Sequence, residues 1–266
     1  MPNFPVSDRR DLAMLPSVHA MRLIAEIQTD FQPLSVWGSD REREFRVAGA
    51  VHAWWHRERF LTGLAWDAIA AAVLLRPAGP PRSVLMLGLA GGTSLRILRH
   101  LLPEAEMTAV EIDPHILDLG REHMALDDLG VETVIADAYA WLRKNRRRFD
   151  VVVDDIYRAT DDDVVRPGAY DAATAASLHR ALAKDGLLAA NLITGRGHRL
   201  TQSKFRAFFR TAFPQVRSVS TPESANEVLV GGEAVLTRQS LAPWWQKFPT
   251  TRDRRFWDAL NVRRLK

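Results

Sequence analysis

Small or acidic residues stand at four points where an apolar run of the sequence ends. A turn of small residues, Gly88–Ser94, follows SVLML, and acidic residues follow at Glu111, Asp137 and Asp154-Asp155. Small residues let backbone approach a ligand closely and leave the N–H groups of a following helix facing it. A carboxylate at the end of the next strand can accept hydrogen bonds from both ribose hydroxyls. Together these positions predict a site for an adenosine-containing ligand.

Each of these features also has a purely structural interpretation. The glycine turn could serve only tight packing between a strand and a helix. Asp113, before Pro114, is expected to cap a helix that opens at that proline, and Asp137 could cap the next helix. Asp154-Asp155 could be a plain acidic loop, although two adjacent carboxylates after an apolar strand need solvent or partners and often have raised pKa values.

The spacing of the glycine turn separates two classes of nucleotide ligand. NAD sites use Gly-x-Gly-x-x-Gly, whereas this turn has Ala90 and Thr93 at the second and third glycine positions. The turn therefore fits a nucleoside without a pyrophosphate better. We favour S-adenosylmethionine, or its decarboxylated form, over NAD.

The elements that must position these residues alternate between strand and helix. Short strands are expected over 21–55 and a helix over 60–75, followed by a proline-rich connector, RPAGPPRS. Beyond it, alternating apolar strands and helices predict a parallel, doubly wound sheet. Strands are expected at 83–89, 107–113, 131–136, 149–155 and 186–193, helices at 94–102, from 114, at 139–147, 171–183 and 202–213, and a closing strand pair near 216–220 and 227–230.

The closing strand pair is typical of one variant of this fold. The expected fold is thus α/β, a Rossmann-like seven-stranded methyltransferase sheet with a small N-terminal β-rich subdomain. Its parts are N-terminal strands and a linking helix over 1–76, a nucleoside-binding catalytic domain over 77–236, and a basic, Trp-rich tail over 237–266.

Composition bounds the function classes further. The 266 residues include no cysteine, which excludes disulfides and a thiol nucleophile and fits a cytoplasmic protein. No apolar run reaches the ~20 residues of a membrane span, and the N-terminus does not resemble a secretory signal. The net charge of +4 comes from scattered arginines, so we expect neither a nucleic-acid nor a membrane partner. The sequence offers no convincing metal site.

On these residues the chain resembles the spermidine synthase family and its methyltransferase relatives, over about 21–236. Thr29–Gln32 is similar to a Ser/Thr-x-Tyr-Gln segment of the family, Gly88–Thr93 to its GGGDGG loop, and Phe149–Asp155 to the strand that ends at its catalytic aspartate. The resemblance implies that Asp155 is catalytic. It implies that the residues that bind the nucleoside are Gln32, Gly88, Ala90, Gly91, Gly92, Glu111, Asp137 and Ala138.

The departures from the family concern the acceptor side. Gly91 replaces the aspartate of GGGDGG, which in the synthases faces the free amine of decarboxylated S-adenosylmethionine and would repel the carboxylate of intact S-adenosylmethionine. Gly91 is expected to remove this repulsion and to open space, which favours the carboxylated donor. Leu61–Gly63 replaces the polyamine contacts, and Arg158 replaces a second loop aspartate. His52 and Asn191 stand where the family has glutamines. A dication needs acidic groups at both ends, so these changes predict a rebuilt acceptor pocket.

Three functions remain open. We favour methyl transfer from S-adenosylmethionine, with Asp155 orienting or deprotonating an unidentified small-molecule or protein acceptor and His52, Tyr157 and Arg158 on the acceptor side. The alternative is aminopropyl transfer from decarboxylated S-adenosylmethionine, again with Asp155 as base. The third is a non-catalytic nucleoside-binding protein. The N-terminal strands could pair across a homodimer, as they do in the family.

Overall fold

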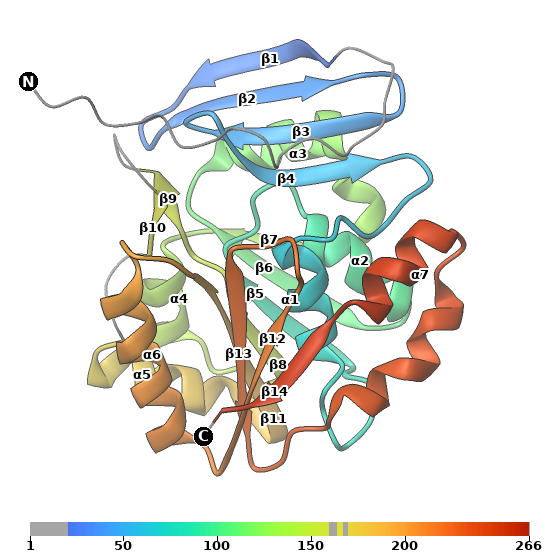
Figure 1. Ribbon diagram of the computed structural model, residues 1–266. Helices are drawn as coiled ribbons and strands as arrows, with labels where there is room; N and C mark the ends of the chain where they lie inside the picture. Colours follow the sequence, from blue (N-terminus) through green and yellow to red (C-terminus); the bar gives the residue numbers. More distant parts are fainter. Residues whose placement is uncertain (1–20, 160–163, 167–169, 266) are drawn as a thin grey trace, which may run out of the picture.

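The computed structural model describes residues 21–159, 164–166 and 170–265. Its main sheet has eight strands in the order β14-β12-β13-β11-β8-β5-β6-β7 (Figure 1). The strands from β11 to β7 run parallel, whereas β13 is antiparallel to β11 and β12, and β14 is antiparallel to β12. The bounds are β5 Ser83–Leu87, β6 Glu106–Glu111, β7 Glu132–Ile135, β8 Phe149–Asp154, β11 Leu182–Ile193, β12 Gln215–Ser220, β13 Asn226–Gly232 and β14 Asn261–Arg264.

Helices cover both faces of this sheet, so the middle residues of its central strands are mainly apolar, as the sequence predicts. One face packs against α1 (Ala65–Val73), α2 (Thr93–Leu101) and α3 (Pro114–Met124). The other face packs against α4 (Ala138–Lys144), α5 (Ala172–Ala181) and α6 (Arg199–Ala212). Two short elements, the 3-10 helix η1 (Asp127–Leu129) and the pair β9 (Arg158–Ala159) and β10 (Val164–Val165), complete this part.

A separate antiparallel sheet of four strands precedes the main one. Its strands are β1 (Arg22–Gln28), β2 (Pro33–Gly38), β3 (Glu42–Val47) and β4 (Ala50–His56), in that order. Figure 1 shows this sheet across the end of the main sheet at which β5, β6 and β8 finish. The α/β class, the closing antiparallel strands and the N-terminal β-rich part are therefore confirmed. Pairing of the N-terminal strands in a homodimer stays a prediction.

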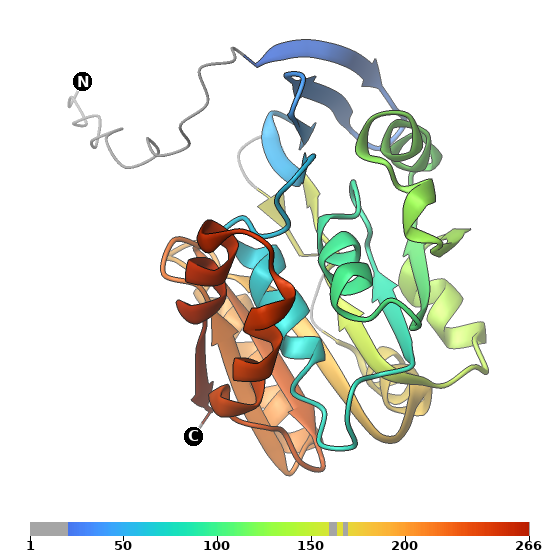
Figure 2. The ribbon, with the colours of Figure 1, turned by 90° about the vertical axis from the view of Figure 1, so that its right-hand side faces the viewer.

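The C-terminal tail adds an element that the sequence did not predict. After a 3-10 helix, η2 (Arg238–Lys247), and α7 (Thr251–Asp258), strand β14 joins the main sheet as its eighth strand. Leu241, Phe248 and Trp257 of the tail are fully buried and belong to the same core as α1 and α2, beside which the tail lies (Figure 2). The interleaved aromatic and basic residues therefore serve intramolecular packing. No helix among the described residues is long and apolar enough to span a bilayer.

Two buried carboxylates hold the loop that leads into α1. Asp67, fully buried, accepts hydrogen bonds from the backbone N–H of Thr62 at 3.0 Å and of Gly63 at 2.7 Å. Asp253 of α7, also fully buried, accepts from the N–H groups of Phe60 at 3.2 Å and Leu61 at 3.3 Å. The helix predicted from residue 60 therefore begins only at Ala65, because these N–H groups bond to side chains instead.

Asp67 is expected to make stability depend on pH. Burial raises its pKa to about 7, against the hydrogen bonds from Thr62 and Gly63 that lower it. The folded chain thus holds a proton that the unfolded chain releases between about pH 4 and pH 7, and the free energy of unfolding falls as the pH rises through that range, by at most about 1.4 kcal/mol per pH unit. Urea unfolding at several pH values should show this loss in the wild type relative to Asp67→Asn. An equal change in both proteins would contradict it, and Glu26→Gln, an exposed carboxylate on β1, is the control.

Candidate active site

A cavity of about 710 Å³ lies between the carboxyl ends of the parallel strands and the N-terminal sheet. In an open α/β sheet this end is where ligands bind, because strand ends and helix N-termini converge there. Of the residues that the sequence singles out, the cavity brings together Gln32, His52, Gly88, Ala90, Glu111, Asp137, Ala138, Asp155 and Tyr157.

The glycine turn needs small residues because its backbone has positive φ angles and because another segment lies close to it. Gly88, Ala90 and Gly92 all have positive φ, and at Gly88 a Cβ atom would lie 2.6 Å from the carbonyl oxygen of Asp155. Any side chain at Gly88 would therefore push apart the ends of β5 and β8. The turn also leads into α2, whose amino end follows directly at Thr93.

Gly91 has a different place from the one that the sequence suggests. Neither Gly91 nor Gly92 is among the residues that line the cavity. A Cβ atom on Gly91 would lie 2.8 Å from the Cβ of Ala53 and 3.2 Å from the Cε of Met124. A side chain at this position would start toward β4 and α3, so the absence of the family's aspartate here does not open space in the cavity.

Glu111 lines the cavity and braces the glycine turn. Its Oε2 accepts from the N–H groups of Leu89 at 3.1 Å and Ala90 at 3.4 Å, and its Oε1 accepts from Ile112 at 2.8 Å and Asp113 at 3.3 Å. Burial raises its pKa, and these four N–H groups oppose that rise. The carboxylate therefore fixes the turn at the wall of the cavity, and a contact with the ribose hydroxyls stays a prediction.

The 29–32 segment is tied to the main sheet through Asp113. Its carboxylate caps α3 by accepting from the N–H of His115 at 3.0 Å, which confirms the predicted cap, and its other oxygen accepts from the Thr29 hydroxyl at 2.7 Å. Because Asp113 is fully buried, this link is rigid. It brings Gln32 to the cavity wall.

Asp137 combines both interpretations that the sequence allowed. It caps α4 by accepting from the N–H of Ala140 at 2.7 Å, and both it and Ala138 line the cavity. The cap uses Oδ1, which leaves the second oxygen for a ligand. A contact with the adenine amino group stays a prediction.

The two aspartates at the end of β8 point to opposite sides, as successive strand residues do. Asp154 is fully buried and forms an ion pair with Arg166 at 2.6 Å, and it accepts hydrogen bonds from the hydroxyls of Tyr139 and Tyr170. It is therefore a structural carboxylate. Its partner Arg166 was not anticipated, since the intervening loop gives no signal of such a contact.

Asp155 faces the cavity instead. Its Oδ1 accepts a 2.8 Å hydrogen bond from the side-chain nitrogen of Asn191, in β11. Burial raises its pKa to about 6, while the Asn191 bond and the charge of Arg166 lower it. A carboxylate with such a pKa in a cavity is suited to accept a proton near neutral pH.

The three residues predicted on the acceptor side have different places. His52 lines the cavity, and burial lowers its pKa to about 4, so it is neutral there. The Tyr157 hydroxyl donates to the carbonyl of Asn191 at 2.7 Å and accepts from the N–H of Ile193 at 3.0 Å, so it is engaged in structure. Arg158 lies in β9, and its side chain is outside the described part of the chain.

Trp66 and Asn226 are among the residues of the cavity that the sequence analysis did not single out. Trp66 lies in the first turn of α1, and Asn226 is the first residue of β13. Trp66 resembles any core aromatic in sequence, and Asn226 lies between two strands that were predicted to close the fold. Only the topology brings them to the cavity.

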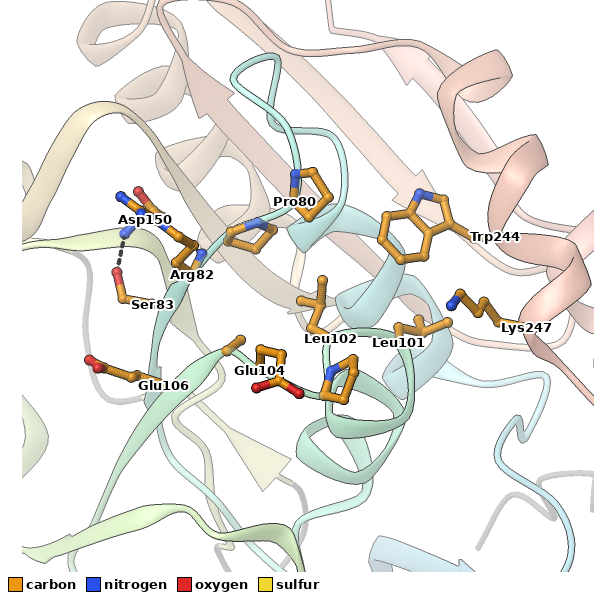
Figure 3. Close-up of a pocket in the computed structure, with 13 residues that line it drawn as sticks. Pro80, Arg82, Ser83, Leu101, Leu102, Glu104, Glu106, Asp150, Trp244 and Lys247 are labelled. Carbon is orange, nitrogen blue, oxygen red and sulfur yellow. Dashed lines mark hydrogen bonds between the residues drawn. The ribbon is translucent and has the colours of Figure 1, made fainter.

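A second hollow, of about 720 Å³, lies at the opposite end of the sheet, where β5, β6 and β8 begin (Figure 3). Its carboxylate Asp150 already accepts from the N–H of Arg82 at 2.7 Å and pairs with Arg76 at 2.9 Å. This end of a parallel sheet offers no helix N-termini. The first cavity is therefore the candidate active site.

Comparison with known proteins matches this sequence to a protein family. Residues 68–222 match the family model described as the spermine/spermidine synthase domain. A "Probable polyamine aminopropyl transferase" of Bifidobacterium longum is 33% identical over 102 residues, 38% of this chain and 22% of that protein. The chain spans only 22%, 23% and 53% of the lengths of the first three curated relatives.

Two solved structures share the fold. A probable spermidine synthase from Corynebacterium glutamicum has a TM-score of 0.69 at 14% identity, over 91% of this chain and 90% of that one. Human methyltransferase-like protein 13, solved in complex with SAH, has a TM-score of 0.53 at 22% identity, over 70% of this chain and 89% of that one. At these identities the likeness concerns the fold alone.

Proposed function

Because this chain belongs to the spermine/spermidine synthase family, we propose that it transfers an aminopropyl group from decarboxylated S-adenosylmethionine to an amine. The sequence alone favoured methyl transfer, with aminopropyl transfer as its alternative. The family model and the curated polyamine aminopropyltransferases support the alternative instead. The geometry of the cavity supports it independently.

The charge of the cavity wall is the observation that carries the proposal. Four carboxylates line the cavity, from Asp30, Glu111, Asp137 and Asp155, and the described lining residues include no lysine or arginine. A wall of this kind concentrates cations and repels anions. Decarboxylated S-adenosylmethionine carries a sulfonium and a free ammonium, whereas intact S-adenosylmethionine adds a carboxylate that no described cationic side chain would meet.

The main argument for methyl transfer is weakened at the same time. It rested on Gly91, where a missing aspartate was taken to remove repulsion of the carboxylate of S-adenosylmethionine. A Cβ atom at that position would lie against Ala53 and Met124, and Gly91 does not line the cavity. The glycine is thus explained by packing and gives no preference for the carboxylated donor.

In the proposed reaction the acceptor nitrogen attacks the aminopropyl carbon that is bonded to the sulfonium. The carbon–nitrogen bond forms as the carbon–sulfur bond breaks, its electron pair goes to sulfur, and methylthioadenosine leaves. The proton lost from the nitrogen goes to the Asp155 carboxylate. Since the sulfonium is already a good leaving group, the protein mainly aligns the two reactants and removes this proton.

Binding measurements should separate the two donors. We expect decarboxylated S-adenosylmethionine to bind at least about tenfold more tightly than S-adenosylmethionine, a difference of about 1.4 kcal/mol, because only the latter brings a carboxylate among the cavity's own. Isothermal titration calorimetry measures both affinities. Methylthioadenosine, which has no sulfonium, ammonium or carboxylate, is the control ligand. Tighter binding of the carboxylated donor would contradict this prediction.

Product analysis tests the reaction itself. The protein should release methylthioadenosine only when decarboxylated S-adenosylmethionine and an amine are both present, with putrescine, cadaverine and spermidine as the first acceptors. Mass spectrometry identifies the aminopropylated amine. Formation of S-adenosylhomocysteine from S-adenosylmethionine would instead support methyl transfer and overturn the proposal.

A further inference from the structure

A line of hydrogen bonds runs from the edge of the cavity to the proposed base. The Ser224 hydroxyl donates to Oδ1 of Asn226 at 3.1 Å, Nδ2 of Asn226 donates to Oδ1 of Asn191 at 3.1 Å, and Nδ2 of Asn191 donates to Asp155 at 2.8 Å. Asn191, Asn226 and Asp155 line the cavity. The family resemblance assigned no role to Ser224 or Asn226.

The three hydrogen bonds all point from donor to acceptor in the same direction, from Ser224 toward Asp155. Each side-chain amide accepts on its oxygen and donates from its nitrogen to the next member, so the orientations of the two amides are linked. If the Asn191 amide were turned by half a rotation, its oxygen would face the Asp155 carboxylate and its nitrogen would face the nitrogen of Asn226. Both contacts would then be repulsive.

The backbone holds Asn191 and Asn226 at this separation. They lie on neighbouring antiparallel strands, with Ile193 of β11 opposite Asn226 of β13. The carbonyl of Asn191 accepts from the Tyr157 hydroxyl at 2.7 Å and from the Arg166 guanidinium. The main chain of Asn191 is thus fixed, and the hydrogen bond from Asn226 restricts the rotation of its side-chain amide.

We infer that Asn226 is a positioning residue, which turns the nitrogen of the Asn191 amide toward Asp155. This role rests on the proposed function, because Asp155 is the base of that reaction. Asn226 acts through Asn191, and Ser224 supports it from the outer end of the line.

The groups around Asp155 define what the loss of this orientation would do. The opposite charges of Asp154 and Arg166 act on the Asp155 carboxylate, and Tyr157 and neutral His52 line the same cavity. The Asn191 amide is the side-chain hydrogen-bond donor to this carboxylate. Without the donor, the protonated form gains and the pKa of Asp155 rises.

The test measures the titration of Asp155 in the whole protein. In Asn226→Leu, which keeps the size of the side chain but not its amide, we expect the pKa of Asp155 to rise from about 6 to about 7, the effect of one hydrogen bond to a charged group. Carbon-13 NMR of aspartate-labelled protein follows the carboxyl signal, which Asp155→Asn identifies by its loss. The acid limb of kcat should move by the same amount, with kcat about threefold lower at pH 6.5 and unchanged at pH 9.

Two further variants complete the design. Ser224→Ala should shift the titration in the same direction by less, and it keeps the test open should Asn226→Leu fold poorly. Glu227→Gln is the matched control, because Glu227 is the next residue on β13 but pairs with Arg206 at 2.6 Å, and we expect no shift there.

The outcomes separate the inference from the proposed function. An Asp155 titration that is unchanged in both Asn226→Leu and Ser224→Ala, or a kcat that falls equally at all pH values, would overturn the positioning role. A shifted NMR titration in a protein that makes no aminopropylated product would support the orientation of Asn191 and overturn only the proposed reaction.

Discussion

Asp155→Asn is expected to lower kcat by about 10²- to 10⁴-fold, the usual contribution of a positioned general base. Asparagine has the same shape and can still accept the hydrogen bond from Asn191, but it cannot take the proton from the acceptor nitrogen. The affinity for the donor should fall far less than kcat, because Gln32, Glu111 and Asp137 are untouched. Steady-state kinetics and calorimetry on the same preparation measure the two quantities.

The pH dependence of the wild type provides the second arm of this prediction. Because burial raises the pKa of Asp155 to about 6, the base is protonated at lower pH, and kcat should fall about tenfold for each pH unit below that value. The residual activity of Asp155→Asn should lack this limb. A variant that keeps both wild-type turnover and the acid limb would remove Asp155 from the mechanism.

Arg166→Met is expected to lower the free energy of unfolding by about 3 to 5 kcal/mol, because it leaves a fully buried carboxylate without its counter-charge. Asp154 and Arg166 are both buried and pair at 2.6 Å. The hydroxyls of Tyr139 and Tyr170 still donate to Asp154, but two neutral donors do not replace a cation. Urea unfolding of the variant and the wild type measures the difference.

The double variant Asp154→Asn with Arg166→Met is the control for this effect. It removes both charges, so it should be more stable than Arg166→Met alone even though it carries one more substitution. If the losses in the free energy of unfolding of Asp154→Asn and Arg166→Met add up to the loss in the double variant, the pair contributes through shape and not through charge. A loss below about 1 kcal/mol in Arg166→Met would contradict the prediction.

The sequence predicts the central sheet well because its signals are local. Apolar runs that are covered on both faces mark β5 and β8, and a capping aspartate before a helix marks the starts of α3 and α4. The positions of Gly88 and Glu111 follow from the same pattern, since strand ends carry the ligand groups in this fold.

The remaining features depend on contacts between distant segments. Strand β14 is only four residues long and pairs at the edge of the sheet with β12, so its own sequence carries little information. The direction of a side chain at Gly91 depends on β4 and α3, and an alignment gives only its position. Trp66 and Asn226 reach the cavity because the N-terminal loop and the closing hairpin meet there, which no local pattern encodes.

The hydrogen bonds from the loop before α1 to Asp253 also determine when this loop can fold during synthesis. Phe60 and Leu61 leave the ribosome long before Asp253, whose carboxylate their N–H groups need and which follows them by 193 and 192 residues. Contacts over such separations form late, because a long stretch of chain must be closed first. The part of the cavity that Gly88, Glu111 and Asp137 form can therefore fold early, while the wall that carries Trp66 is completed only after α7 has been made.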